Sequence, residues 1–153
     1  MTSLRPYFLW FFLLSLIITF IIGLIGLFLP IGSGGFLTAF PYLIAMIVVL
    51  FRFLKKEKRA PTSSEKHKLA LGFMGIFWGY SLIGFIVGLL WASRADPQVL
   101  DDAWTYLQHP RFFIYAIGLF LLLAVPLYLV TLWFYGKQAR RMVNKMQEDH
   151  EIE

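Results

Sequence analysis

Three long stretches of the chain carry no charged side chain. They are residues 6–51, 69–93 and 112–136. An apolar run of about 18 residues or more without charge is long enough to cross a bilayer as a helix. The pattern therefore predicts an integral membrane protein, and it confines almost all of the charge to the segments that connect the membrane-spanning helices.

The composition supports this interpretation. Of the 153 residues, 59% are hydrophobic and 15% are charged, whereas soluble domains average about 45–50% apolar and about 25% charged residues. The chain has no cysteine, which excludes disulfides, thiolate catalysis and iron–sulfur clusters. The net charge of +5 follows from the retention of Lys and Arg in cytoplasmic loops, so we expect no nucleic-acid partner.

We predict an all-α fold, a single membrane domain built as a four-transmembrane-helix bundle. The spans are expected at about residues 7–29, 36–54, 69–91 and 112–135. A turn rich in Gly and Pro at residues 30–35 separates the first two spans. The first apolar run is longer than the segment of about 7–15 residues in a signal peptide, so we expect it to remain as an uncleaved span.

Positive charge is distributed unevenly between the two sides of this bundle. All Lys and Arg residues except Arg94 and Arg111 lie before the first span, at the end of the second span and in the loop that follows it, or after the fourth span. Because Lys and Arg are retained in cytoplasmic loops, both termini are expected in the cytoplasm. An even number of spans requires the two termini to share one side, so the charge pattern and the span count agree.

The connecting segments contain signals for further helix boundaries. Thr62 and Glu65 fit a capping box at the start of the third helix. Asp96 and Pro97 fit the N-cap and first position of a short amphipathic helix in the outer loop. After Gly136, apolar residues at helical spacing predict a cytoplasmic C-terminal extension of the fourth helix, which is either a surface helix or a docking helix for a partner.

Small residues inside the spans are the predicted contacts between helices, because helices in lipid associate through close packing of small side chains. The predicted helix-packing residues are Ser15, Thr19, Gly23, Gly26, Gly72, Gly75, Gly79, Gly84, Gly88 and Pro126. The glycines of the third span fall on two different faces, which predicts a central position for that helix. Pro126 predicts a kink in the fourth helix, and the kink acts either as a hinge or only in packing.

Two further groups of residues are candidate binding sites. Trp78, Tyr80 and Ser81 lie near the middle of the third span and form a candidate apolar-ligand pocket for a lipid tail or a quinone, with plain core packing as the alternative. Basic residues around the loop between the second and third spans are candidate contacts to anionic lipid headgroups. They are Arg52, Lys55, Lys56, Lys58 and Arg59. The rule that sets orientation would also explain their presence.

The spans lack the side chains that intramembrane chemistry needs. All nine acidic residues lie outside the spans, and His67, His109 and His150 lie in loops or in the tail. Proton-coupled transport usually requires an ionisable group at depth, a b-type haem requires intramembrane histidines, and a serine protease requires a base beside its serine. We therefore expect no catalytic residue, no metal site and no cofactor, in a protein that is not an enzyme.

A short motif precedes the third span. It consists of Arg59, Pro61, Thr62 and Glu65 in the pattern Arg-x-Pro-Thr-x-x-Glu. Together with Ser33-Gly34 at the start of the second span and Phe51 before the basic run, this motif resembles a family of uncharacterised small four-span bacterial inner-membrane proteins. The resemblance covers residues 32–72. It implies four spans, a location in the bacterial inner membrane and no known activity.

Three kinds of function are compatible with these features. The first is a non-enzymatic accessory or assembly partner of other membrane components. The second is a small oligomeric transporter or channel, in which the glycine faces form the interfaces between copies. The third is a lipid- or quinone-binding module. The expected partners are the lipid bilayer, anionic lipid headgroups, and either another membrane protein or further copies of this chain.

Overall fold

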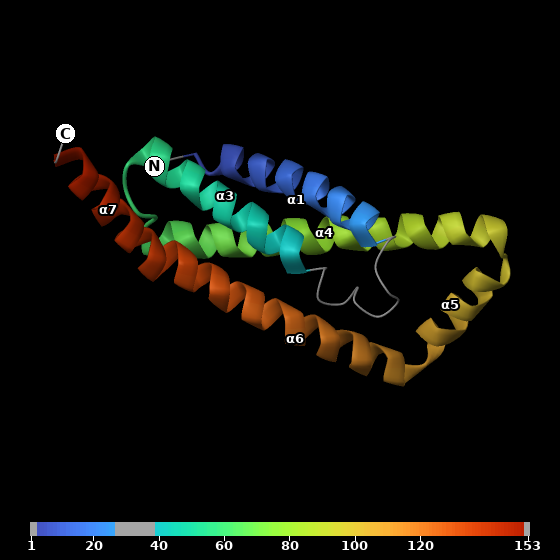
Figure 1. Cartoon of the computed structure of the whole chain (residues 1–153). Coiled ribbons are helices and arrows are strands. Elements are labelled where there is room, and N and C mark those ends of the chain that lie inside the picture. The colour runs from blue at the N-terminus through green and yellow to red at the C-terminus, as the bar shows by residue number, and fades with distance from the viewer. Residues whose placement is uncertain (1–2, 27–38, 152–153) are drawn as a thin grey trace. The chain divides into compact units, whose positions relative to one another are not determined.

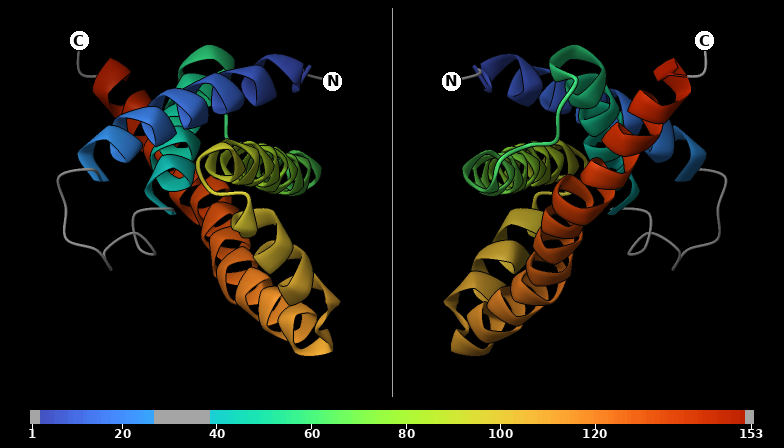
Figure 2. Two further views of the ribbon diagram at one scale, coloured as in Figure 1. Left: turned by 90° about the vertical axis from the view of Figure 1, so that its right-hand side faces the viewer. Right: turned by 90° about the vertical axis from the view of Figure 1, so that its left-hand side faces the viewer.

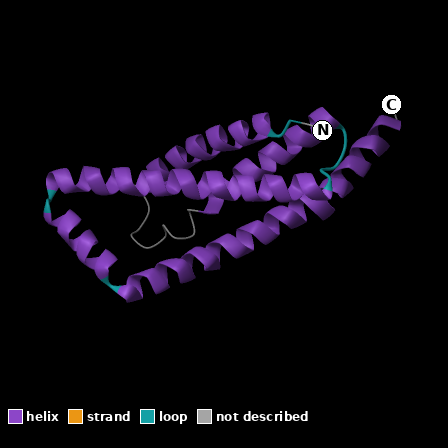
Figure 3. Ribbon diagram, turned by 180° about the vertical axis from the view of Figure 1, so that it is seen from behind, coloured by secondary structure: helices purple, strands orange, loops and turns teal. Residues whose placement is uncertain are grey.

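A computed structural model describes residues 3–26 and 39–151. In this part of the chain all regular structure is helical (Figures 1 and 3), which confirms the predicted all-α class. The helices are α1 (Arg5–Gly26), α3 (Ala39–Glu57), α4 (Ser63–Ala95), α5 (Gln98–Gln108), α6 (Pro110–Trp133), the π-helix η1 (Phe134–Gln138) and α7 (Ala139–Glu151).

Three stretches of helix are long and apolar enough to cross a membrane. They are Arg5–Ile25, Ser63–Ala95 and Pro110–Glu148, so the chain is a helical membrane protein. Helix α3 covers most of the predicted second span, but its last turns carry Arg52, Lys55 and Lys56. Residues 36–38 of that predicted span lie outside the described part. The fourth span therefore stays a prediction.

The helices form two compact units. The first contains the described residues of Met1–Phe77 and Leu127–Glu153, and the second contains Trp78–Pro126. Along α6 the two units meet at Pro126, which lies inside the helix as predicted. Proline has no amide hydrogen to donate within the helix, so this boundary coincides with a gap in the hydrogen bonding of α6.

Aromatic rings form the core of the first unit, where α1 packs along α3 (Figure 2). The rings of Phe11 and Phe73 are stacked with centroids 4.1 Å apart. Tyr42 meets Phe11 and Phe77 edge to face, both at 5.4 Å, and Tyr135 meets Phe73 at 5.8 Å. These rings are almost completely buried. Aromatic pairs contribute about 0.5–1.5 kcal/mol beyond their buried area, so the cluster joins α1, α3, α4 and η1 into one packed group.

Hydrogen bonds of three buried hydroxyl groups tie α3 to the end of α6 and to η1. The Thr131 hydroxyl donates to the Leu127 carbonyl at 2.8 Å, and it lies 2.7 Å from the Tyr42 hydroxyl. Because threonine has a single hydroxyl proton, Tyr42 must donate to Thr131. The Tyr135 hydroxyl donates to the Met46 carbonyl at 2.9 Å. Both tyrosines thereby satisfy their polar ends inside an apolar core.

Among the predicted packing glycines, Gly72 lies against α1. The ring of Phe8 fills the space that a Cβ at Gly72 would need, so a side chain there would push against α1. At Gly136 the nearest atom is the Nζ of Lys66, 3.8 Å from the Cβ position. No atom of the described residues is found within 4 Å of the corresponding position at Gly23, Gly75, Gly79, Gly84, Gly88 and Gly118. The close helix contacts predicted at Gly23, Gly75, Gly79, Gly84 and Gly88 therefore stay predictions.

The second unit contains α4 from Trp78 onward, helix α5, and α6 as far as Pro126. The Trp78 ring lies 4.5 Å from that of Phe120. The Asp96 carboxylate accepts a hydrogen bond from the Gln98 amide at 2.9 Å, so the short helix begins with the cap that the sequence predicts. None of the residues of α5 is buried, and Trp104 is 64% exposed. Its apolar side chains are therefore available to lipid.

Replacement of Gly72 by alanine should destabilise the first unit by about 1–3 kcal/mol, because overpacking forces neighbouring side chains to move. Gly75→Ala is the matched control on the same helix, and it should be neutral or slightly stabilising because alanine favours helix. The measurement is SDS-induced unfolding of the purified protein in mixed micelles. Equal losses in the two variants would contradict the close contact between Gly72 and Phe8.

The direction of the hydroxyl contact predicts unequal effects at its two ends. Thr131→Val leaves the Tyr42 proton buried without an acceptor, at a cost of about 1–3 kcal/mol, whereas Tyr42→Phe leaves the Thr131 bond to Leu127 intact and should cost about 0.5–1.5 kcal/mol. Adding Tyr42→Phe to Thr131→Val should recover stability, because it removes the unsatisfied donor. The same unfolding measurement checks this, and a double variant less stable than Thr131→Val would overturn the assignment.

Candidate functional site

Most of the charged residues of the first unit gather where the start of α1, the end of α3, the start of α4 and η1 with α7 come together. We call this region the charged end. Its described cations are Arg5, Arg52, Lys55, Lys56, Lys58, Arg59, Lys66, Lys68, Lys137, Arg140, Arg141 and Lys145. The candidate lipid-contact residues of the predicted basic loop all belong to it, and so do cations from α4, η1 and α7.

Contacts between α1 and α3 define one side of the charged end. The Tyr7 hydroxyl donates to the Glu57 carboxylate at 2.9 Å. The Arg52 guanidinium lies 4.0 Å from the centre of the Trp10 ring, a cation–π contact that shields part of its charge from solvent. Arg52 is therefore engaged within the chain, although its side chain remains exposed.

The loop between α3 and α4 is held by the residues of the predicted motif. Arg59 makes a forked ion pair with Glu65, with both nitrogen–oxygen distances 2.8 Å. The Thr62 amide donates to the Glu65 carboxylate at 2.9 Å, and the Glu65 amide donates to the Thr62 hydroxyl at 3.3 Å. This confirms the capping box. At the end of α3, Lys58 adopts left-handed backbone with φ 51°, and its amide donates to the Leu54 carbonyl at 2.9 Å, as in a helix C-cap.

The ion pair also sets the protonation of Glu65, which precedes the uncharged part of α4. Hydrogen bonds from Arg59, and secondarily from Thr62, lower the pKa of Glu65 from its ordinary value of 4.5 to about 2. The hydrogen bond to Glu65 in turn raises the pKa of Arg59. Arg59 was a candidate lipid contact, but its guanidinium is already paired with a carboxylate, so it has less charge to offer a headgroup than an unpaired lysine.

The first turns of α4 contact α6 and η1. The His67 Nδ1 lies 3.1 Å from the Tyr128 hydroxyl. The Nζ of Lys66 lies 3.8 Å from the position that a Cβ at Gly136 would occupy, so the lysine side chain lies against η1. His67 therefore lies in a helix and has a polar partner, and the prediction that it sits in a loop is wrong. The capping box at Thr62 and Glu65 predicts a helix start before His67, so the loop assignment followed the apolar run instead of the cap.

The other two histidines belong to other segments of the chain. His109 is exposed between α5 and α6, and the side chain of His150 lies outside the described part. Among the described residues, no group of three or more His, Cys, Asp or Glu side chains is placed to hold a metal ion.

The remaining predicted site residues are divided between the two units. Ser15 is fully buried and its hydroxyl has no hydrogen-bond partner among the described residues, whereas Thr19 is exposed one turn later. Trp78, Tyr80 and Ser81 belong to the second unit and are all partly exposed. Trp78 and Tyr80 are two positions apart on α4, which turns their side chains about 200° away from each other. The Trp78 ring packs on the ring of Phe120 in α6.

The paired carboxylate predicts a pH-dependent contribution to stability. A lowered pKa contributes stability that is complete above the ordinary value of 4.5 and is lost as the pH falls through about 2. Glu65→Gln should therefore lower the unfolding temperature at pH 6, and the difference from the unchanged protein should shrink below about pH 4.5. Glu148→Gln, at an exposed site, is the control. Equal unfolding temperatures at pH 6 for Glu65→Gln and the unchanged protein would contradict the pairing.

The chain matches no protein-family model, and it shows no match to a curated protein or to a solved structure. The geometry of the chain itself therefore carries the functional argument.

Proposed function

We propose that the chain is a four-span protein of the bacterial inner membrane that acts, without catalysis, as an accessory or assembly partner of other membrane components. The observation that carries the proposal is how little of each candidate span the chain covers by itself. In Arg5–Ile25, Ser63–Ala95 and Pro110–Glu148, 11% of the most apolar 18-residue window is buried. Such helices leave nearly all of their surface to lipid or to other proteins.

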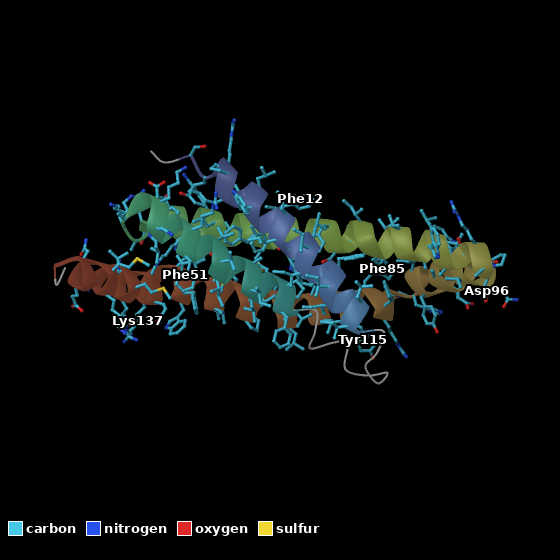
Figure 4. All side chains as sticks on the ribbon, turned by 45° about the horizontal axis from the view of Figure 1, so that its top comes forward. Phe12, Phe51, Phe85, Asp96, Tyr115 and Lys137 are labelled. Atoms are coloured by element: carbon cyan, nitrogen blue, oxygen red, sulfur yellow. The ribbon has the colours of Figure 1, made fainter. Side chains whose placement is uncertain are left out.

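Outward-facing apolar side chains illustrate this on several helices (Figure 4). Phe12 on α1, Phe51 on α3 and Phe85 on α4 are 36%, 45% and 66% exposed. The open positions at Gly84 and Gly88 add a face without large side chains. Small residues four positions apart allow two helix backbones to approach closely, so this face suits a second membrane helix better than lipid alone.

The contacts at the charged end support the proposed topology. They join the beginning of α1 to the end of α3, and the beginning of α4 to η1. With α3 as the second span, these junctions fall on one side of the membrane together with all Lys and Arg residues except Arg94 and Arg111. Cytoplasmic retention of positive charge then favours both termini in the cytoplasm.

The polar groups of the first unit hold its own parts together, which favours a protein that acts through contacts of its outer surface. The Tyr42, Thr131 and Tyr135 hydroxyls hold helices together, and the Arg59–Glu65 pair holds a loop.

A small oligomeric transporter is the second candidate. The observation that favours it is the buried Ser15 hydroxyl, because an unsatisfied polar group in an apolar core is costly and a hydrated path would satisfy it. The third hypothesis, a lipid- or quinone-binding module, has less support because Trp78 and Tyr80 diverge.

Purification of the tagged full chain in a mild detergent, followed by mass spectrometry of the intact assembly, tests the proposal. We expect a different membrane protein in fixed ratio with this chain. Gly84→Leu/Gly88→Leu should reduce its recovery by about five-fold or more, because two leucines block close helix approach. Gly118→Leu, at an open single glycine of α6, should have little effect. A lone monomer would contradict the proposal, and an assembly of identical copies would favour the transporter.

A further inference from the structure

Lys66 occupies an unusual position at the charged end. It lies one turn before Leu69 and Ala70, which are fully buried, and is itself half-buried. Its Nζ and Cδ lie 3.8 and 4.0 Å from where a Cβ at Gly136 would be, which is ordinary van der Waals contact. The lysine side chain therefore lies against η1 at Gly136.

A second cation lies on the same side of η1 and α7. Arg140 follows Gly136 by four residues, which is about one turn of helix. It therefore returns to the helix face against which Lys66 lies. Arg140 is exposed. The position of this segment is fixed from both sides of the glycine, because Tyr135 bonds to the Met46 carbonyl and Ala139 is fully buried. Lys137, labelled in Figure 4, is also exposed and adds charge beside this face.

No carboxylate of the described residues neutralises this pair of cations. Glu65 is paired with Arg59, and Glu57 accepts the hydrogen bond from Tyr7. Lys66 and Arg140 have no part in the ion pair between Arg59 and Glu65. Two positive groups on the same helix face, neither paired with one of these acids, favour an anion.

The depth of the site favours a lipid anion. Lys66 comes three residues before the uncharged stretch 69–93, and Gly136 is the last residue of the uncharged stretch 112–136. Both candidate spans therefore enter the apolar layer directly beside the two cations. A phosphate group at this level would have its acyl chains next to apolar helix surface, whereas a free phosphate ion would gain only the charge contact. Basic residues near the surface each contribute about 1 kcal/mol toward anionic lipid.

We propose that Lys66 and Arg140 form a binding site for the headgroup of an anionic phospholipid, beside Gly136 of η1. The site differs from the loop cations Arg52 and Arg59, whose charges are engaged by Trp10 and Glu65. The proposal needs only a membrane-spanning chain, so it stands or falls independently of the accessory role.

The test uses the full chain in neutral detergent, titrated with phosphatidylglycerol and followed by native mass spectrometry. Lys66→Met and Arg140→Gln should each weaken binding by about five-fold or more. Lys68→Met, on another face of α4, and Arg5→Gln, on α1, remove the same charges from exposed sites and should change binding by less than about two-fold. The double variant should lose less than the product of the two single losses, because both cations serve one headgroup.

Several outcomes would overturn the site. Equal losses in all four single variants would show a diffuse positive surface, and unchanged binding in Lys66→Met and Arg140→Gln would place the lipid elsewhere. Equal binding of phosphatidylcholine would show that the negative charge is not read. Inorganic phosphate that displaces the lipid at millimolar concentration would show a site for free phosphate instead.

Discussion

The stack of Phe11 on Phe73 is the contact on which the first unit depends. The two rings lie 4.1 Å apart and nearly parallel, and Tyr42 and Tyr135 pack on their edges. In lipid, apolar burial between helices gives little driving force, so shape and close packing decide which helices associate. Flat rings from α1 and α4 can stack only if the helices come near each other, and Gly72 provides that closeness beside Phe8.

Polar contacts add direction to this packing. The Tyr42 and Tyr135 hydroxyls each have a partner across a helix boundary, 89 residues away in the sequence. Such bonds average less than about 1 kcal/mol in membrane proteins, yet each fixes the rotation of one helix against another. The fixed rotation presents Lys66 to Gly136 at the charged end. The aromatic core and the proposed lipid site are therefore consequences of the same arrangement.

The parts of the structure that could be predicted from the sequence are those with local causes. The helix caps at Thr62 and Asp96 depend on neighbouring residues, and the apolar stretches depend on composition alone. Gly72 and Gly75 look alike in the sequence, because only the position of α1 makes one crowded and the other open. Two further contacts join residues that are distant in the sequence. They are the hydrogen bond from Tyr42 to Thr131 and the contact of Lys66 with Gly136. Thr131 gave a signal in hindsight, as a polar side chain in an otherwise apolar span.

The π-helix between α6 and α7 has a consequence for the register of the whole C-terminal segment. Its wider turn contains one residue more than an α-helical turn would, so every position after Gln138 is rotated by about 100° from where an uninterrupted helix would place it. The five residues Phe134–Gln138 thus rotate the side chains of α7 about the helix axis relative to those of α6. Because of this rotation, the apolar residues of α6 and the charged residues of α7 repeat along the helix from different starting angles. Each helix can therefore face its own surroundings, although the two are continuous.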